Sequence, residues 1–89
     1  MPILNVPPPY RGPTLGQGEV PVTGRTVREC LESAERAFPG FRDQVLDPAG
    51  KVHRFVRLFV RGDAVDPARI DDPVGESDEI RILAAIAGG

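Results

Sequence analysis

The chain has little of the chemistry that usually marks an enzyme or a metal site. Its 89 residues include one cysteine, one histidine, one lysine and no tryptophan. The lone Cys30 excludes a disulfide framework, and Cys30 and His53 together are too few for a Cys/His metal centre. Ser33 and Ser77 have no His/Asp partners at a useful spacing, so a catalytic triad is not supported. We therefore expect no metal, no bound cofactor and no side-chain nucleophile.

The charge balance and the absence of long hydrophobic runs exclude further classes. Eleven basic and thirteen acidic residues give a net charge of −2, without the basic excess of a nucleic-acid binder. No apolar run approaches the roughly 18 residues of a membrane span. The first residues, MPILNVPPPYRG, lack the basic and apolar regions of a secretory signal. The expected protein is cytoplasmic and binds neither nucleic acid nor membrane.

The short length also limits what the chain can do. A domain of this size buries only about 60–65% of its unfolded surface, too little for a large core and a deep active-site cleft together. The ten glycines and ten prolines need turns and loops rather than long regular elements. Both observations count against a self-contained enzyme and favour a binding or carrier module.

The sequence clearly predicts one helix. Thr26 followed by Glu29 is a capping box, and Pro39-Gly40 is a stop signal. Between them, apolar residues recur at the spacing of one helical stripe: Val27, Cys30, Leu31, Ala34 and Phe38. On such a stripe Cys30 is a small buried hydrophobe rather than a reactive thiol.

Strand patterns flank this helix on both sides. Short strands are expected over 2–6, with Leu4 and Val6 on one face, and over 19–23, where Pro21 places the strand at a sheet edge. The strongest alternation, over 54–61, puts Val56, Leu58 and Val60 opposite Phe55, Arg57, Phe59 and Arg61. In the final strand over 77–84, Ile80, Ile82 and Ala84 oppose Arg81 and Leu83.

The remaining segments read as connections. Pro7 to Pro9 should force an extended link into a loop anchored by Tyr10. Residues 41–52 are expected to form a loop with a turn at 47–50. Residues 62–79, with seven acidic side chains and one basic, should hold a short strand near 64–65. That acidic stretch is either a solvated loop or a docking surface for a basic partner.

This order of elements predicts an α+β protein of the β-grasp, ubiquitin-like type: a mixed sheet of four or five strands wrapped around one main helix. One helix covers only one sheet face, so the other face stays partly exposed. The β-grasp domain should span 1–84, followed by a flexible tail over 85–89.

The tail ends in Gly88-Gly89, where chemistry needs no side chain. Glycine has no Cβ, so such an end can thread a narrow channel in another protein. It would deliver an α-carboxylate, whose ordinary pKa is about 3.3–3.7. A carboxylate is a poor acyl donor until ATP converts it to a mixed anhydride with AMP, which sulfur or amine nucleophiles attack.

Two stretches resemble the ThiS/MoaD family of ubiquitin-like sulfur carriers: the segment from Asp47 to Val56, and Ile82 to Gly89. Within that family, the likeness is greatest to the carrier of actinobacterial cysteine biosynthesis. The resemblance implies that a MoeB/ThiF-like activating enzyme adenylates the Gly89 carboxylate with ATP and that sulfide or a persulfide converts it to a thiocarboxylate. The implied acceptor is a synthase such as a cysteine synthase, and a JAMM-type metalloprotease is a further implied partner.

The resemblance also implies a partner-binding face beside the tail. In this chain that face should present Phe55, Phe59 and Leu83, ringed by Arg57, Arg61 and Arg81, and continue into Ile86, Ala87 and Gly88. The alternative is that the loop over 41–52 covers Phe55 and Phe59.

Three functions stay open at this point. The chain is a sulfur carrier acted upon by partner enzymes, a ubiquitin-like modifier conjugated through Gly89 to lysines, or a plain interaction domain. The final sulfur acceptor is not written in the sequence.

Overall fold

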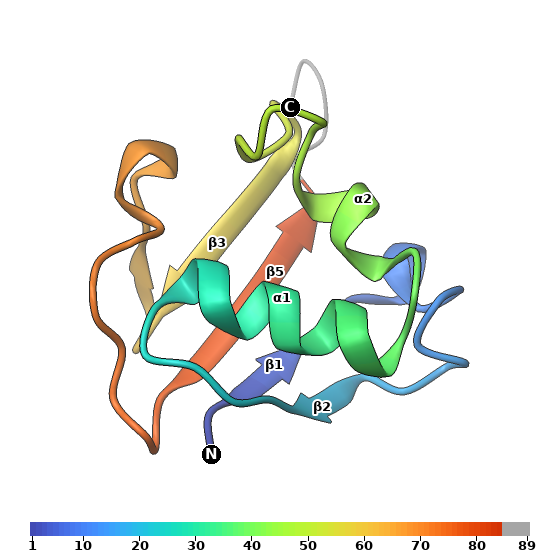
Figure 1. Cartoon of the computed structure of the whole chain (residues 1–89), viewed down its shortest axis with the longest axis horizontal. Coiled ribbons are helices and arrows are strands. Elements are labelled where there is room, and N and C mark those ends of the chain that lie inside the picture. Colours follow the sequence, from blue (N-terminus) through green and yellow to red (C-terminus); the bar gives the residue numbers. More distant parts are fainter. Residues whose placement is uncertain (85–89) are drawn as a thin grey trace.

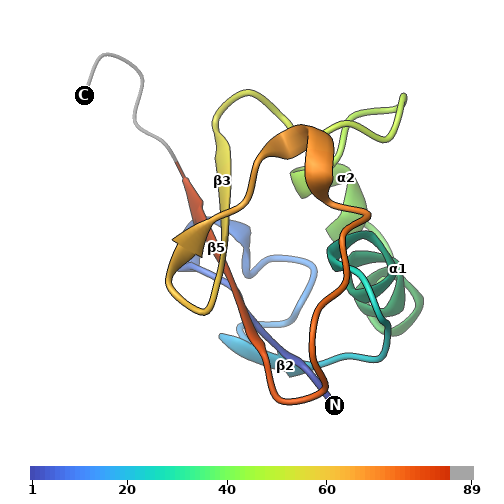
Figure 2. The ribbon, with the colours of Figure 1, turned by 90° about the vertical axis from the view of Figure 1, so that its left-hand side faces the viewer.

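A computed structural model describes residues 1–84, so the predicted tail over 85–89 lies outside the described residues. Five strands form one sheet: β1 (Ile3–Asn5), β2 (Glu19–Pro21), β3 (Val56–Val60), β4 (Asp63–Ala64) and β5 (Glu79–Ala84). The helix α1 (Val27–Ala37) crosses one sheet face, and the short α2 (Phe41–Val45) follows it (Figure 1). Seen from the side, both helices lie on the same side of the sheet (Figure 2). The predicted mixed sheet around one main helix is confirmed.

The sheet order is β2-β1-β5-β3-β4, with β5 in the centre. β5 runs parallel to β1 and antiparallel to β3. The outer strands are poor templates for further pairing, because β2 ends on Pro21 and β4 has only two residues. The predicted edge position of Pro21 is confirmed.

The helix α1 begins as its sequence predicts. The Thr26 hydroxyl accepts a hydrogen bond from the Glu29 N–H at 3.1 Å. The Glu29 carboxylate, however, accepts from the Arg25 N–H at 2.9 Å rather than from Thr26. The predicted stripe faces the sheet, with Val27, Cys30, Leu31 and Ala34 buried. Burial raises the pKa of the Cys30 thiol, which suits a packed hydrophobe rather than a nucleophile.

The prediction of a loop throughout 41–52 is wrong, because α2 occupies its first five residues. Gly40 reverses the chain at φ 97°. The Glu35 carboxylate then accepts hydrogen bonds from the N–H groups of Gly40 and Arg42, at 3.0 and 2.9 Å. Phe41 is fully buried, so a helix of one turn is held by tertiary packing and borrowed capping.

The predicted turn at 47–50 is confirmed and well satisfied. The Asp47 carboxylate accepts hydrogen bonds from the N–H groups of Ala49 and Lys51, both at 2.9 Å. These bonds, with that from Lys51 the largest cause, lower the pKa of Asp47. His53 joins the same corner, since its Nε2 lies 2.9 Å from the Asp43 carbonyl oxygen.

The N-terminal loop is also more compact than predicted. Pro8–Tyr10 form a 3-10 turn instead of an extended link, because the φ that proline fixes suits both conformations. Tyr10 packs against the core, as predicted. The Arg11 Nε donates to the Val6 carbonyl at 2.9 Å, and the fully buried Thr14 hydroxyl donates to the Gln17 carbonyl at 2.9 Å.

The acidic segment is tied down by arginines. Arg28 on α1 pairs with Asp71 at 2.7 Å and also donates to the Gly50 carbonyl at 2.8 Å, joining three segments. The short strand of the acidic segment, β4, lies at Asp63–Ala64, one residue earlier than predicted. Ile70, in the middle of this segment, is 1% exposed and belongs to the core.

Candidate functional site: the exposed sheet face

Strand alternation separates a core face from an open face on β3 and β5. On the core side, Val56, Leu58, Val60, Ile80 and Ile82 are all buried. The opposite side carries the residues that alternate with them: Arg57, Phe59 and Arg61 from β3 and its end, and Glu79, Arg81 and Leu83 from β5. Within residues 1–84, α1 and α2 lie on the core side of the sheet, and neither covers the second set (Figure 2). We call this second set the open face.

The register brings the predicted partner-binding residues together. Arg57 lies directly opposite Leu83, and Phe59 lies opposite Arg81. Leu83 is 41% exposed, which is high for a leucine on a central strand. Phe59 is half-buried among its arginine neighbours. Apolar side chains flanked by arginine are typical of the centre of a protein interface.

Phe55 sits at the border of this face, in the turn before β3. It is 45% exposed, and the Arg54 guanidinium lies over its ring at 4.9 Å from the centroid. The alternative that the segment over 41–52 covers Phe55 is therefore wrong. An exposed ring under a guanidinium is available for contact with a partner.

Hydrogen bonds and ion pairs hold the three arginines of the open face in place, and Arg81 pairs with its neighbour Glu79 at 3.2 Å. Arg61 pairs with Asp78 at 2.6 Å, and Asp78 also accepts from the Gly75 N–H at 2.7 Å. That backbone bond, followed by the Arg61 guanidinium, lowers the pKa of Asp78. Arg57 instead donates to the Arg54 carbonyl at 2.9 Å, so its charge has no carboxylate partner within residues 1–84.

Two hollows flank the ridge formed by Arg81 and Leu83. One, of about 620 Å³, lies toward Phe59 and Arg61. The other, of about 500 Å³, lies toward the end of β1 and is bordered by Arg11. Sequence reasoning missed Glu79 and Arg11 as neighbours of this ridge. Alternation along β5 could have placed Glu79 there, whereas no local signal places Arg11.

The other predicted site residues, Ile86, Ala87, Gly88 and Gly89, lie outside the described residues. The structure does show where the chain approaches them. β5 ends at Ala84, immediately after Leu83 on the open face. Within residues 1–84, no cluster of His, Cys, Asp and Glu could hold a metal ion, and no helix is long and apolar enough to cross a membrane.

A sequence profile of the ThiS family matches residues 11–89. The chain belongs to the ThiS family. Among ThiS-related proteins, it is 30% identical to the sulfur carrier protein CysO of Mycobacterium tuberculosis, over 97% of this chain and 96% of the relative. The predicted family membership is thereby confirmed.

Solved structures agree with the fold. A chain of the crystal structure of the Amycolatopsis orientalis BexX/CysO complex matches with a TM-score of 0.90 and 28% identity over 100% of both chains. The crystal structure of Mycobacterium tuberculosis CysO matches at 0.89 and 27%, over 97% of this chain and 100% of that one. Small archaeal modifier protein 1 from Haloferax volcanii matches at 0.76 and 19%, over 99% and 98% of the two chains, which shows the shared β-grasp fold alone.

Proposed function

We propose that this ThiS-family chain is a sulfur carrier, a protein co-substrate whose reactive group is the α-carboxylate of Gly89. The observation that carries the proposal is the family match, which extends through residue 89. Supporting it is the likeness to the sulfur carrier CysO over nearly the whole of both chains. No side chain in residues 1–84 offers a competing reaction centre.

The chemistry takes place in three stages: activation of the carboxylate, loading with sulfur, and delivery of the sulfur. An activating enzyme of the MoeB/ThiF type joins the Gly89 carboxylate oxygen to the α-phosphorus of ATP, and pyrophosphate leaves. Sulfide then attacks the carbonyl carbon of this acyl adenylate, AMP leaves with the bonding electron pair, and a thiocarboxylate remains. In the acceptor enzyme, this sulfur attacks a carbon of the substrate, and a leaving group departs from that carbon with its bonding electron pair. Hydrolysis of the resulting thioester releases the thiol product and regenerates the carboxylate.

The open face is the proposed handle for these partners. Its centre, with Leu83, Phe59 and the nearby Phe55, supplies exposed apolar surface, and Arg57 and Arg81 supply charge. A fully extended chain spans at most about 3.3–3.6 Å per residue, so the five residues after Ala84 reach at most about 18 Å. A partner that grips the open face must therefore hold its reaction centre within that distance of the end of β5.

The proposed partners all bind the open face and the tail of this chain. They are the activating enzyme, a sulfur-accepting synthase such as a cysteine synthase, and a JAMM-type metalloprotease that would act at the same end. Cysteine, or another sulfur-containing metabolite, is the proposed product.

The proposal is tested by mass spectrometry after incubation with ATP, a MoeB/ThiF-like enzyme and sulfide. Trypsin cleaves after Arg81 and releases residues 82–89, which contain neither methionine nor cysteine. An oxygen-for-sulfur exchange in that peptide therefore cannot be confused with oxidation of Met1 or Cys30. We expect the exchange only when ATP is present, and none in a variant that lacks Gly89.

Two results would count against the proposal. One is an unmodified peptide under conditions in which the same enzyme loads its own cognate carrier. The other is recovery, without any thiocarboxylate, of tryptic peptides in which residues 82–89 are joined through Gly89 to lysines of other proteins, which would assign the chain to protein modification.

A further inference from the structure

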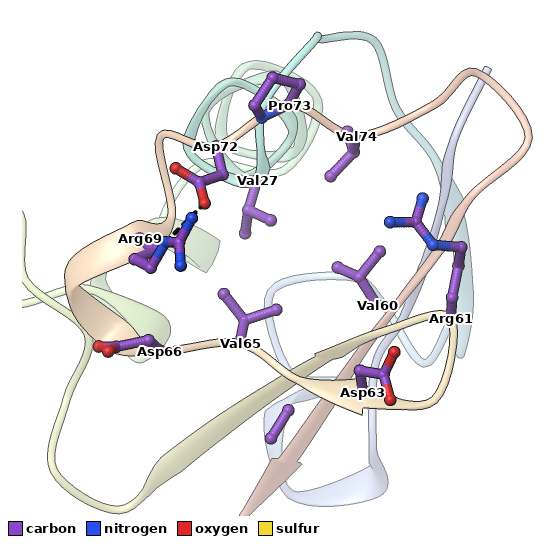
Figure 3. Close-up of a pocket in the computed structure, with 11 residues that line it drawn as sticks. Val27, Val60, Arg61, Asp63, Val65, Asp66, Arg69, Asp72, Pro73 and Val74 are labelled. Carbon is purple, nitrogen blue, oxygen red and sulfur yellow. Dashed lines mark hydrogen bonds and ion pairs between the residues drawn. The ribbon is translucent and has the colours of Figure 1, made fainter.

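A third hollow lies away from the centre of the open face, where β4 and the following 3-10 turn (Pro67–Arg69) approach the first turn of α1. Its volume is about 340 Å³, at the lower end of the range for ligand sites, about 300–1,000 Å³. Four valines from four segments form its apolar floor: Val27, Val60, Val65 and Val74. Figure 3 shows their side chains pointing toward one another across the opening. We call this the valine pocket.

The rim of the valine pocket carries arginine and aspartate side chains, of which some form ion pairs and others do not. Arg69 pairs with Asp72 at 2.7 Å (Figure 3), and Arg61 is engaged by Asp78 at 2.6 Å. The Asp63 carboxylate has no hydrogen bond or ion pair to any residue in 1–84, although the Asp63 backbone belongs to the β3–β4 ladder. The Asp66 carboxylate accepts only from the Ala68 N–H, at 2.9 Å, and has no cation beside it. The rim therefore carries negative charge that no cation in residues 1–84 neutralises, with the Asp66 carboxylate on its outer side, turned away from the valines (Figure 3).

We propose that the valine pocket binds a segment of a partner protein in which one apolar side chain is flanked by arginine or lysine. The floor would take the apolar side chain, because Val65 and Val74 are only partly buried, and covering them removes apolar surface on both molecules from water. The carboxylates of Asp63 and Asp66 would face the basic neighbours and steer their approach. The volume limits the inserted part to one or two side chains.

The valine pocket and the open face select different chemistry. The open face carries unpaired arginine and suits an acidic or apolar partner surface, whereas the valine pocket suits a basic one. The two sites meet at Arg61, which borders both hollows. A single large partner can thus engage both, and two smaller partners can engage them separately.

The test is a titration of the full-length, ¹⁵N-labelled chain with short synthetic peptides, followed by amide chemical shifts. The probe has Arg-Leu-Arg at the centre of Gly/Ser flanks. Matched peptides carry Glu-Leu-Glu, which reverses the charge, or Arg-Gly-Arg, which removes the apolar side chain. We expect the Arg-Leu-Arg peptide to shift the amides of Val27, Val65 and Val74, and both matched peptides to bind more weakly.

Charge-neutral variants complete the test. Replacing both rim carboxylates, Asp63→Asn with Asp66→Asn, should weaken the Arg-Leu-Arg peptide by about two- to thirty-fold, from two exposed charge contacts. Asparagine still caps the turn after position 66, so the fold should be retained, which an unchanged melting temperature checks. Asp43→Asn, at an exposed carboxylate on α2 that borders none of the three hollows, is the matched control and should leave the affinity unchanged.

Three outcomes overturn the proposal. They are equal binding of all three peptides, an affinity unaffected by the paired asparagine variant, and shifts of the pocket amides on dilution of the chain alone. The last would assign the pocket to a second copy of this chain. None of these measurements involves ATP or sulfide, so their failure leaves the sulfur-carrier proposal untouched.

Discussion

Under the proposed sulfur-carrier function, truncating Leu83 to alanine should weaken recognition of the chain by a MoeB/ThiF-like activating enzyme. Fully burying a leucine side chain is worth about 1.5–3 kcal/mol. In the free chain 41% of Leu83 is exposed. A partner that covers this part gains about 0.6–1.2 kcal/mol, taking that share of the full value. Leu83→Ala should therefore raise KM about three- to eight-fold, at a tenfold change per 1.4 kcal/mol.

The assay is pyrophosphate release by a MoeB/ThiF-like enzyme at varied concentrations of the chain. The value of kcat should stay the same, because Leu83 touches no reacting atom. Leu15→Ala is the matched control, since Leu15 is 82% exposed and borders none of the hollows described above. Equal KM values for the two variants, or an effect of Leu83→Ala on kcat alone, would refute the assignment of the open face as the handle.

Three further predictions concern the scaffold. Arg28→Ala should lower the free energy of unfolding by about 1–2 kcal/mol, because it removes one partly exposed ion pair and one hydrogen bond. Asp71→Ala removes only the ion pair and should lower it less, and urea titration measures both effects. Phe41→Ala should cost about 3–5 kcal/mol in the same titration, because its fully buried ring anchors α2; a loss under 1 kcal/mol would mean that α2 does not pack as described. Since the pKa values of Asp47 and Asp78 are lowered in the folded chain, their stabilisation is complete above the ordinary value of about 3.9 and is lost as the pH falls through the folded values. Asp78→Asn should accordingly flatten the dependence of the urea midpoint on pH below about 4, and an unchanged slope would contradict the cause given for the Asp78 shift.

Much of the fold follows from local patterns in the sequence. The 3.6-residue stripe from Val27 to Ala34 specifies both the helix and the side that it buries. Alternation along β3 and β5 specifies which side chains are buried and which reach the open face, so Arg57, Phe59, Arg81 and Leu83 could be placed before the structure was known.

Features that depend on distant packing could not be predicted in this way. α2 has a single turn, and its stability comes from burying Phe41 and from capping by Glu35, which belongs to the preceding helix. The prolines before Tyr10 allow both an extended and a 3-10 path. The valine pocket is formed by four segments that are separate in the sequence, so no local spacing of residues predicts it.

The central position of β5 has a consequence for synthesis of the chain. β1 and β2 are on one side of β5, and β3 and β4 are on the other, so neither pair can join the common sheet until β5 has formed. A nascent chain that has not yet released Glu79–Ala84 from the ribosome lacks the strand that unites the sheet. Domains generally fold as units, and chains with exposed strand edges are prone to aggregation. Folding is therefore sensitive to truncation: a chain broken before β5 lacks the strand that unites the two halves of the sheet and cannot reach the stable form.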